Sequence, residues 1–221
     1  MDKAVVDFIH GLVRYTLFII VLIAALSRIG VQTASVVAVI GAAGLAVGLA
    51  LQGSLSNFAA GVLIVAFRPF KSGDYVEIGG VAGSVDSIQI FQTVLKSPDN
   101  KMVVVPNSAV IGGAITNYSR HETRRVDMVI GVSYKSDLQK TKRVLRETLE
   151  KDPRILKDPD MTIGVLTLAD SSINFVVRPW CKTSDYWAVY FDSMQAIKEA
   201  LDANGIEIPF PQMDVHLNKI N

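Results

Sequence analysis

Few side chains in this sequence are arranged for covalent chemistry. The three histidines are scattered, and no two have the spacing of a metal-binding helix. Cys181 is the only cysteine, which excludes an internal disulfide and a cysteine-based metal site. The run Asp170-Ser171-Ser172 lacks the glycine-flanked serine of a hydrolase. We therefore expect no enzymatic activity, no metal and no cofactor.

Phosphate-binding and nucleic-acid-binding patterns are also weak. The glycines at 79, 80 and 83 lack the Lys-Ser/Thr of a phosphate-binding loop, so they indicate turns. Arg124 and Arg125 are adjacent, but the neighbouring segments carry no stripe of arginine and aromatic residues. With a net charge of only +1, these two arginines are typical of a solvated edge, and we expect no nucleic-acid partner.

The most informative stretch is uncharged. No Asp, Glu, Lys or Arg occurs between Arg28 and Arg68. As one helix this gap would extend for about 58 Å, whereas a bilayer core is about 30 Å thick. We therefore expect a break at Gln52-Gly53-Ser54, giving a membrane helix over residues 35–53 and an interfacial helix over residues 54–67. Ser54 or Ser56 would cap the second helix, and Gly61 is a second candidate for a flexible point.

The first of these helices has two edges of small residues and a leucine pair between them. Small residues let helix backbones approach closely in lipid. A ring of identical helices needs two such edges on each helix, with Leu45 and Leu49 directed at the axis as apolar girdles. A tightly packed helix in a monomeric membrane bundle explains the composition equally well. The edges consist of Ala38, Ala42 and Ala46 on one side and Gly41, Gly44 and Gly48 on the other.

Two further segments place this stretch in a membrane protein. Residues 1–30 predict a first membrane helix, in which Arg14 reaches the headgroups or pairs with an acid. The link to the second helix carries only Arg28, whereas Arg68 and Lys71 follow the apolar stretch. This bias places the N-terminus and residues 68–221 in the cytoplasm.

The soluble remainder predicts two modules and a tail. Residues 68–118 have short strands and glycine turns, which indicate a small curved β-domain. Residues 119–209 predict the order βαββαβ of a ferredoxin-like domain, with residues 206–208 as the last strand. Ser136 or Asp137 would cap its first helix and Ser184 or Asp185 its second, which Gly205 would end. Residues 210–221 alternate apolar and polar after two prolines. A lone terminal strand is marginal, so it would close a barrel only with copies of itself.

Several of these motifs together resemble the small-conductance mechanosensitive channel family of bacteria. The resemblance rests on VVAVIGAAGLAVGLALQGSLSNFAAGVLIVAFRPF, then VVVPNS, SSINFVVRPW and PFPQMDV, and it covers essentially the whole chain. It implies a homoheptamer in the inner membrane that opens under tension and releases ions and small osmolytes on hypo-osmotic shock.

The resemblance also implies roles for individual residues. Leu45 and Leu49 would form the constriction, the Ala and Gly edges the helix packing, and Gly53 a kink. The cytoplasmic part would be an Sm-like β-domain, a ferredoxin-like α/β-domain and a seven-stranded barrel. Asp127 would lie near side portals and filter ions. The turn at Asn107 would lie under residues 54–67, in contact with Asn57.

Two features depart from the family pattern. Members usually carry at least one more membrane helix before the one at residues 1–30, which leaves open whether Met1 is the native start or a fragment boundary. Ser108 follows Asn107 where glycine is common, which is expected to alter the contact with Asn57 and the ease of inactivation.

Two other classes of protein remain as alternatives. A membrane-tethered adaptor would use the α/β-domain to bind partners, but an anchor helix does not need two edges of small residues. A solute transporter needs a polar group in mid-membrane, which the second helix lacks. A mass of about seven copies in detergent would favour the channel, and a monomer would favour the adaptor.

Overall fold

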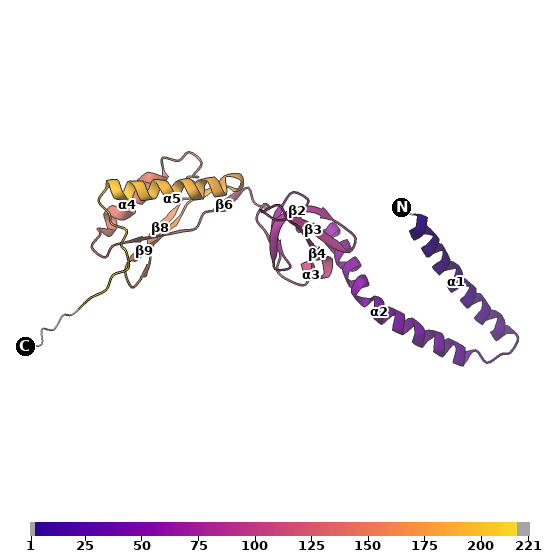
Figure 1. Cartoon of the computed structure of the whole chain (residues 1–221). Coiled ribbons are helices and arrows are strands. Elements are labelled where there is room, and N and C mark those ends of the chain that lie inside the picture. Colours follow the sequence, from indigo (N-terminus) through magenta and orange to yellow (C-terminus); the bar gives the residue numbers. More distant parts are fainter. Residues whose placement is uncertain (1–2, 216–221) are drawn as a thin grey trace, which may run out of the picture.

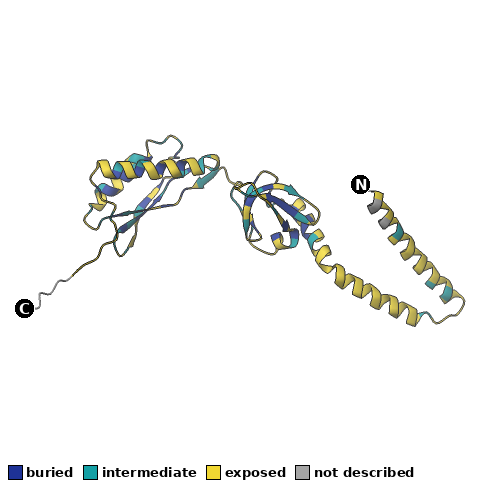
Figure 2. Ribbon diagram, in the orientation of Figure 1, coloured by how far each residue is buried: buried dark blue, intermediate teal, exposed yellow. Residues whose placement is uncertain are grey.

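Two long helices lead into two soluble modules (Figure 1). The computed structural model describes residues 3–215. Helix α1 is Lys3–Arg28 and α2 is Ala34–Phe67, and both are long and apolar enough to cross a membrane. Gly30 turns the chain between them with φ of +85°, a conformation that glycine adopts without a Cβ clash. Along most of both helices the side chains are exposed in the single chain (Figure 2).

Helix α2 differs from the sequence prediction because it does not break. The chain stays helical through Gln52, Gly53 and Ser54, so no second helix begins there and neither Ser54 nor Ser56 caps one. Figure 1 shows the axis curving toward the β-domain instead. A single glycine costs a helix only about 1 kcal/mol. The apolar residues on both sides of Gly53 favour helix strongly enough to outweigh that cost.

The β-domain is a five-stranded antiparallel sheet with a short helix. Its strands have the order β4-β3-β2-β1-β5, and a bulge lies between Val85 and Ser87 in β2. Bulges bend a strand and increase its twist, which fits the predicted curvature. The elements are β1 (Tyr75–Ile78), β2 (Val81–Ile88), β3 (Gln92–Lys96), β4 (Met102–Pro106), α3 (Asn107–Ile111) and β5 (Thr116–Asn117).

The core of the β-domain includes the end of α2. Ile64 is fully buried with Phe70, Val76 and Leu95 in one apolar cluster. The helix ends at Arg68, which has a left-handed backbone (φ 48°) and is followed by Pro69. The last turns of α2 are therefore part of this module, so its boundary lies before the predicted residue 68.

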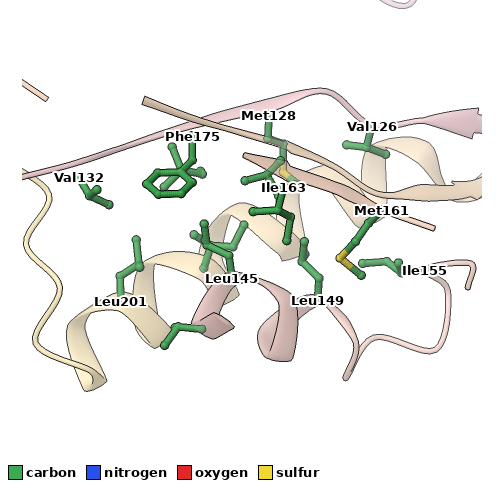
Figure 3. Packing of buried hydrophobic residues seen from close by; sticks show 14 of the residues in the cluster. Val126, Met128, Val132, Leu145, Leu149, Ile155, Met161, Ile163, Phe175 and Leu201 are labelled. Atoms are coloured by element: carbon green, nitrogen blue, oxygen red, sulfur yellow. The ribbon is translucent and has the colours of Figure 1, made fainter. Parts of the chain in front are cut away.

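The α/β-domain packs two helices against a three-stranded antiparallel sheet of order β7-β9-β8. Its core gathers side chains from both helices and the sheet, including Leu145, Phe175 and Leu201 (Figure 3). A two-stranded sheet of β6 and β10 ties the linker to this domain. The elements are β6 (Thr123–Arg125), β7 (Met128–Val132), α4 (Leu138–Leu149), β8 (Thr162–Leu168), β9 (Ile173–Arg178), β10 (Trp180–Lys182), the 3-10 turn η1 (Thr183–Asp185) and α5 (Tyr186–Ala203).

The ends of the helices in this domain partly follow the prediction. Asp137 caps α4 by accepting hydrogen bonds from the backbone N–H groups of Gln139 and Lys140, which lowers the pKa of its carboxyl. Ser184 or Asp185 was expected to cap α5, but no side chain makes such a bond, because both residues lie in η1, which precedes the helix. Gly205 follows α5 in the left-handed conformation, as expected.

The C-terminal prediction is corrected in part. Residues 206–208 form no strand, although the Ser133 N–H donates to the Glu207 carbonyl at 2.9 Å and so places this segment beside β7. That is the position of the missing fourth strand. Residues 210–215 have no regular structure, and the rest of the predicted barrel strand lies outside the described residues.

Candidate functional site

The predicted gate residues lie in the middle of α2. Leu45 and Leu49 are one helical turn apart, and their side chains are 66% and 63% exposed in the single chain. Exposing leucine side chains to water is unfavourable, so we expect lipid or other protein to surround these two. Helix α2, which carries both leucines, has no charged side chain along its whole length.

The small-residue edges are equally uncovered. A Cβ atom added at Gly41, Gly44 or Gly48 would meet nothing within 4 Å other than its own helix. The alanines at 38, 42 and 46 are exposed as well. The single chain therefore gives no packing reason for these small residues, whereas a close neighbouring helix would.

Gly53 and Gly61 differ in their surroundings. Gly53 is open, with nothing within 4 Å of an added Cβ, so no packing contact requires a glycine there. At Gly61, an added Cβ would lie 2.5 Å from the Ile90 carbonyl oxygen and 2.6 Å from Nδ2 of Asn107. Gly61 is buried, and its lack of a side chain lets α2 touch the β-domain. Gly61 is thus a contact point between α2 and the β-domain.

Asn57 joins α2 to the β-domain by a hydrogen bond. Its Oδ1 accepts from the Ser108 backbone N–H at 2.9 Å, and its Nδ2 donates to the Gly53 carbonyl at 2.9 Å. The predicted contact between Asn57 and the turn at Asn107 is therefore present, and it is made by the backbone of Ser108. Because a backbone N–H is the donor, serine at 108 provides it as well as glycine would.

Asn107 is fully buried and holds the loop under α2. Its Nδ2 donates to the carbonyls of Gln89 and Ile90 at 2.9 and 3.1 Å, and its Oδ1 accepts from the Thr93 hydroxyl at 2.9 Å. These bonds satisfy its polar groups, so the side chain is stable at this depth. Asn107 therefore fixes the Ile90 carbonyl against which Gly61 packs.

Sequence reasoning predicted that the turn at Asn107 and Ser108 contacts α2, but it missed the Ile90 carbonyl. Ile90 and Ser108 contribute backbone groups, for which side-chain identity gives no signal. Phe58 and Phe91 also approach, with ring centroids 6.4 Å apart. Aromatic residues at these two positions were the one visible hint of contact.

Asp127 lies away from α2, between β6 and β7. Its carboxylate forms ion pairs with Nε of Arg125 and Nε of Arg178, each at 2.8 Å. Only Arg125 is aligned as a hydrogen-bond donor. The Asp127 side chain is 52% exposed, so its charge is partly neutralised and still reaches solvent.

The family comparisons agree with this architecture. Residues 11–52 match the transmembrane helices 2/3 of mechanosensitive ion channels, residues 53–120 match their β-domain, and residues 126–208 match the MscS C-terminal domain. The small-conductance mechanosensitive channel of Edwardsiella ictaluri is 58% identical over 217 residues, which cover 98% of this chain and 76% of that protein.

Solved structures are similar as well. The closed-state Helicobacter pylori MscS crystal structure has a TM-score of 0.89 at 36% identity and covers 99% of this chain and 87% of that one. Arabidopsis thaliana MSL1 has a TM-score of 0.80 at 21% identity over 95% of this chain and 75% of that one, a likeness of fold alone. The predicted fold class and the absence of an enzymatic role are thereby confirmed. The chain belongs to the MscS family of mechanosensitive ion channels.

Proposed function

We propose that seven copies of this chain surround a pore in the bacterial inner membrane, with Leu45 and Leu49 as its gate. The soluble domains lie in the cytoplasm, and the open pore passes ions and small osmolytes during hypo-osmotic shock. The observation that supports this proposal is the uncovered face of α2, which carries two leucines between two edges of small residues.

The gate closes without a plug. Two stacked rings of leucine side chains leave a constriction too apolar to hold water, and a dry constriction blocks ions. Membrane tension favours the state with the larger area in the plane of the bilayer. Tilting of α2 widens both rings, and the pore fills with water. The Ala and Gly edges let neighbouring helices slide, because no large side chain locks them together.

Several other residues have secondary roles in this proposal. Gly53 allows α2 to bend during opening, while Asn57 and Gly61 transmit its movement to the β-domain. Asp127 lines a side entrance to the cytoplasmic vestibule and biases ion entry. The C-terminal residues 210–221 of seven copies close a barrel, and membrane lipids are the partners of α1.

The test is single-channel recording from reconstituted protein under graded suction. Leu45→Ser and Leu49→Ser place a hydroxyl in the dry constriction, so we expect both variants to open at lower tension than the wild type. Leu12→Ser in α1 introduces the same change outside the proposed pore and serves as the control. Unchanged thresholds in both gate variants would rule out the leucine gate.

A further inference from the structure

A cleft of about 920 Å³ lies at the junction of the β-domain and the α/β-domain. Its walls come from the end of β3, from the linker after β5 and from the start of α5. The linker is fixed on both sides, since the Tyr118 N–H donates to the Tyr75 carbonyl and β6 pairs with β10. The size falls in the range of small-molecule sites, about 300–1,000 Å³.

Arg124 lies in this cleft between two aromatic rings. Its guanidinium carbon is 3.9 Å from the centroid of Tyr186 and 4.9 Å from that of Tyr118. Among the described residues, no carboxylate pairs with it and no oxygen accepts from it, whereas its neighbour Arg125 pairs with Asp127. Arg125 is exposed, as the predicted solvated edge requires, whereas Arg124 is half-buried between the two rings. When aromatic rings cover the flat faces of a guanidinium, its N–H groups still point outward in its plane and can donate to an anion.

Other side chains complete an anion-binding and ring-binding surface. Lys96 lines the cleft from the β3 side and, in the described chain, makes no ion pair. Trp187 lines it from α5; its indole is stacked on Phe191 and stays 61% exposed. The nearby Glu77 carboxylate accepts from the Tyr118 hydroxyl at 2.8 Å. This bond raises the pKa of Tyr118, so its phenol stays neutral.

We propose that this cleft binds a mononucleotide, with its phosphate on Arg124 and Lys96 and its base stacked on Trp187. Two cations match a phosphate dianion in charge, and the arginine fork matches its oxygens. An aromatic face accepts any nucleobase by stacking. The cleft is much larger than an inorganic anion needs, and its indole and phenol rings suit a flat group.

A bound nucleotide would connect the two soluble domains. Lys96 belongs to the β-domain and Trp187 to the α/β-domain, so one ligand would hold both. The site lies outside α2 and does not depend on the leucine gate, so nucleotide binding and gating are tested separately.

The test is equilibrium binding of AMP to the full chain in detergent. Calorimetry and tryptophan fluorescence measure the binding. We expect saturable binding that quenches the fluorescence, with adenosine or inorganic phosphate alone binding more weakly. Lys96→Gln should weaken AMP binding about tenfold or more by removing a charge-assisted contact. Trp187→Leu should abolish most of the quenching and weaken binding by about fivefold or more.

The control is Lys135→Gln, which removes an exposed lysine of the α/β-domain outside the cleft. It should bind AMP like the wild type. Lys96 and Trp187 are surface residues, so their variants are expected to fold. Absence of AMP binding at millimolar concentration would overturn the proposal. A second copy that covers the cleft in the assembly would give this same result. Equal effects of Lys96→Gln and Lys135→Gln, or phosphate binding as tight as AMP, would overturn it too.

Discussion

At the scale of single residues, Asn57 connects the membrane helix to the soluble part. It accepts from a backbone N–H in the first turn of α3 and donates to the carbonyl of Gly53. Hydrogen bonds of this kind contribute about 1 kcal/mol each, and the loss of one partner leaves the other unsatisfied. The side chain thus links the open glycine of α2 to the β-domain.

Asn57→Ala should weaken this link. We expect faster hydrogen exchange at the Ser108 amide and altered inactivation under sustained suction, since α2 is then held to the β-domain by the contacts of its later turns, such as those at Gly61 and Ile64. Ser108→Gly is the matched control, because it removes a side chain and keeps the N–H donor. If Ser108→Gly changed inactivation as much as Asn57→Ala, the side chain of residue 108 would matter and the backbone contact would not explain the coupling.

At the scale of elements, the two glycines in the second half of α2 have opposite surroundings. Gly53 has free space around it, whereas Gly61 faces the Ile90 carbonyl and Asn107. Helical spacing alone does not separate these cases, since both glycines lie in the same uncharged helix. The difference depends on a loop about thirty residues further along the chain.

Gly61→Ala should therefore destabilise the junction of α2 and the β-domain by about 1–3 kcal/mol, the usual cost of overpacking. The readout is hydrogen exchange of the amides in the last turns of α2 and in the 89–91 loop. Gly53→Ala adds the same methyl group where nothing is within 4 Å, so exchange at the junction should stay as in the wild type. Equal protection at the junction in both variants would contradict the close contact at Gly61.

The success of sequence reasoning depended on how local each signal was. The β-strands were predictable because turn residues such as Gly79 and Gly80 bound short apolar runs, and both glycines do have positive φ. The break at Gly53 was wrong because one glycine does not outweigh the helix around it. Helix α3 was missed because five residues after a proline carry too little periodicity. The positions of Ile90 and the Ser108 amide depend on tertiary packing alone.

At the scale of the whole molecule, one chain alone leaves most of α2 without protein neighbours. Gly41 has no neighbour within 4 Å of an added Cβ, so the chain itself would accept a larger residue there. An effect of such a residue on gating would therefore not come from a clash within this chain, and we expect it to come from the neighbouring copy.

Gly41→Leu should shift or abolish gating under suction and lower the fraction of assembled protein. Ala43→Leu is the control, since two residues further on the helix presents the opposite side. Native mass measurement in detergent should give about seven copies for the wild type. A monomer would favour the membrane-tethered adaptor, and wild-type thresholds in Gly41→Leu would remove the packing argument.

The absence of charge from α2 has an electrical consequence. Moving one elementary charge through a membrane potential of 100 mV involves about 2.3 kcal/mol. Because α2 carries no Asp, Glu, Lys or Arg from Ala34 to Phe67, its tilting moves no side-chain charge through the field. If Leu45 and Leu49 form the proposed gate, side-chain charge on α2 contributes no electrical work to its opening. Voltage sensitivity, where present, belongs to charges outside this helix, such as Arg14 in α1 and Arg68 at the membrane exit.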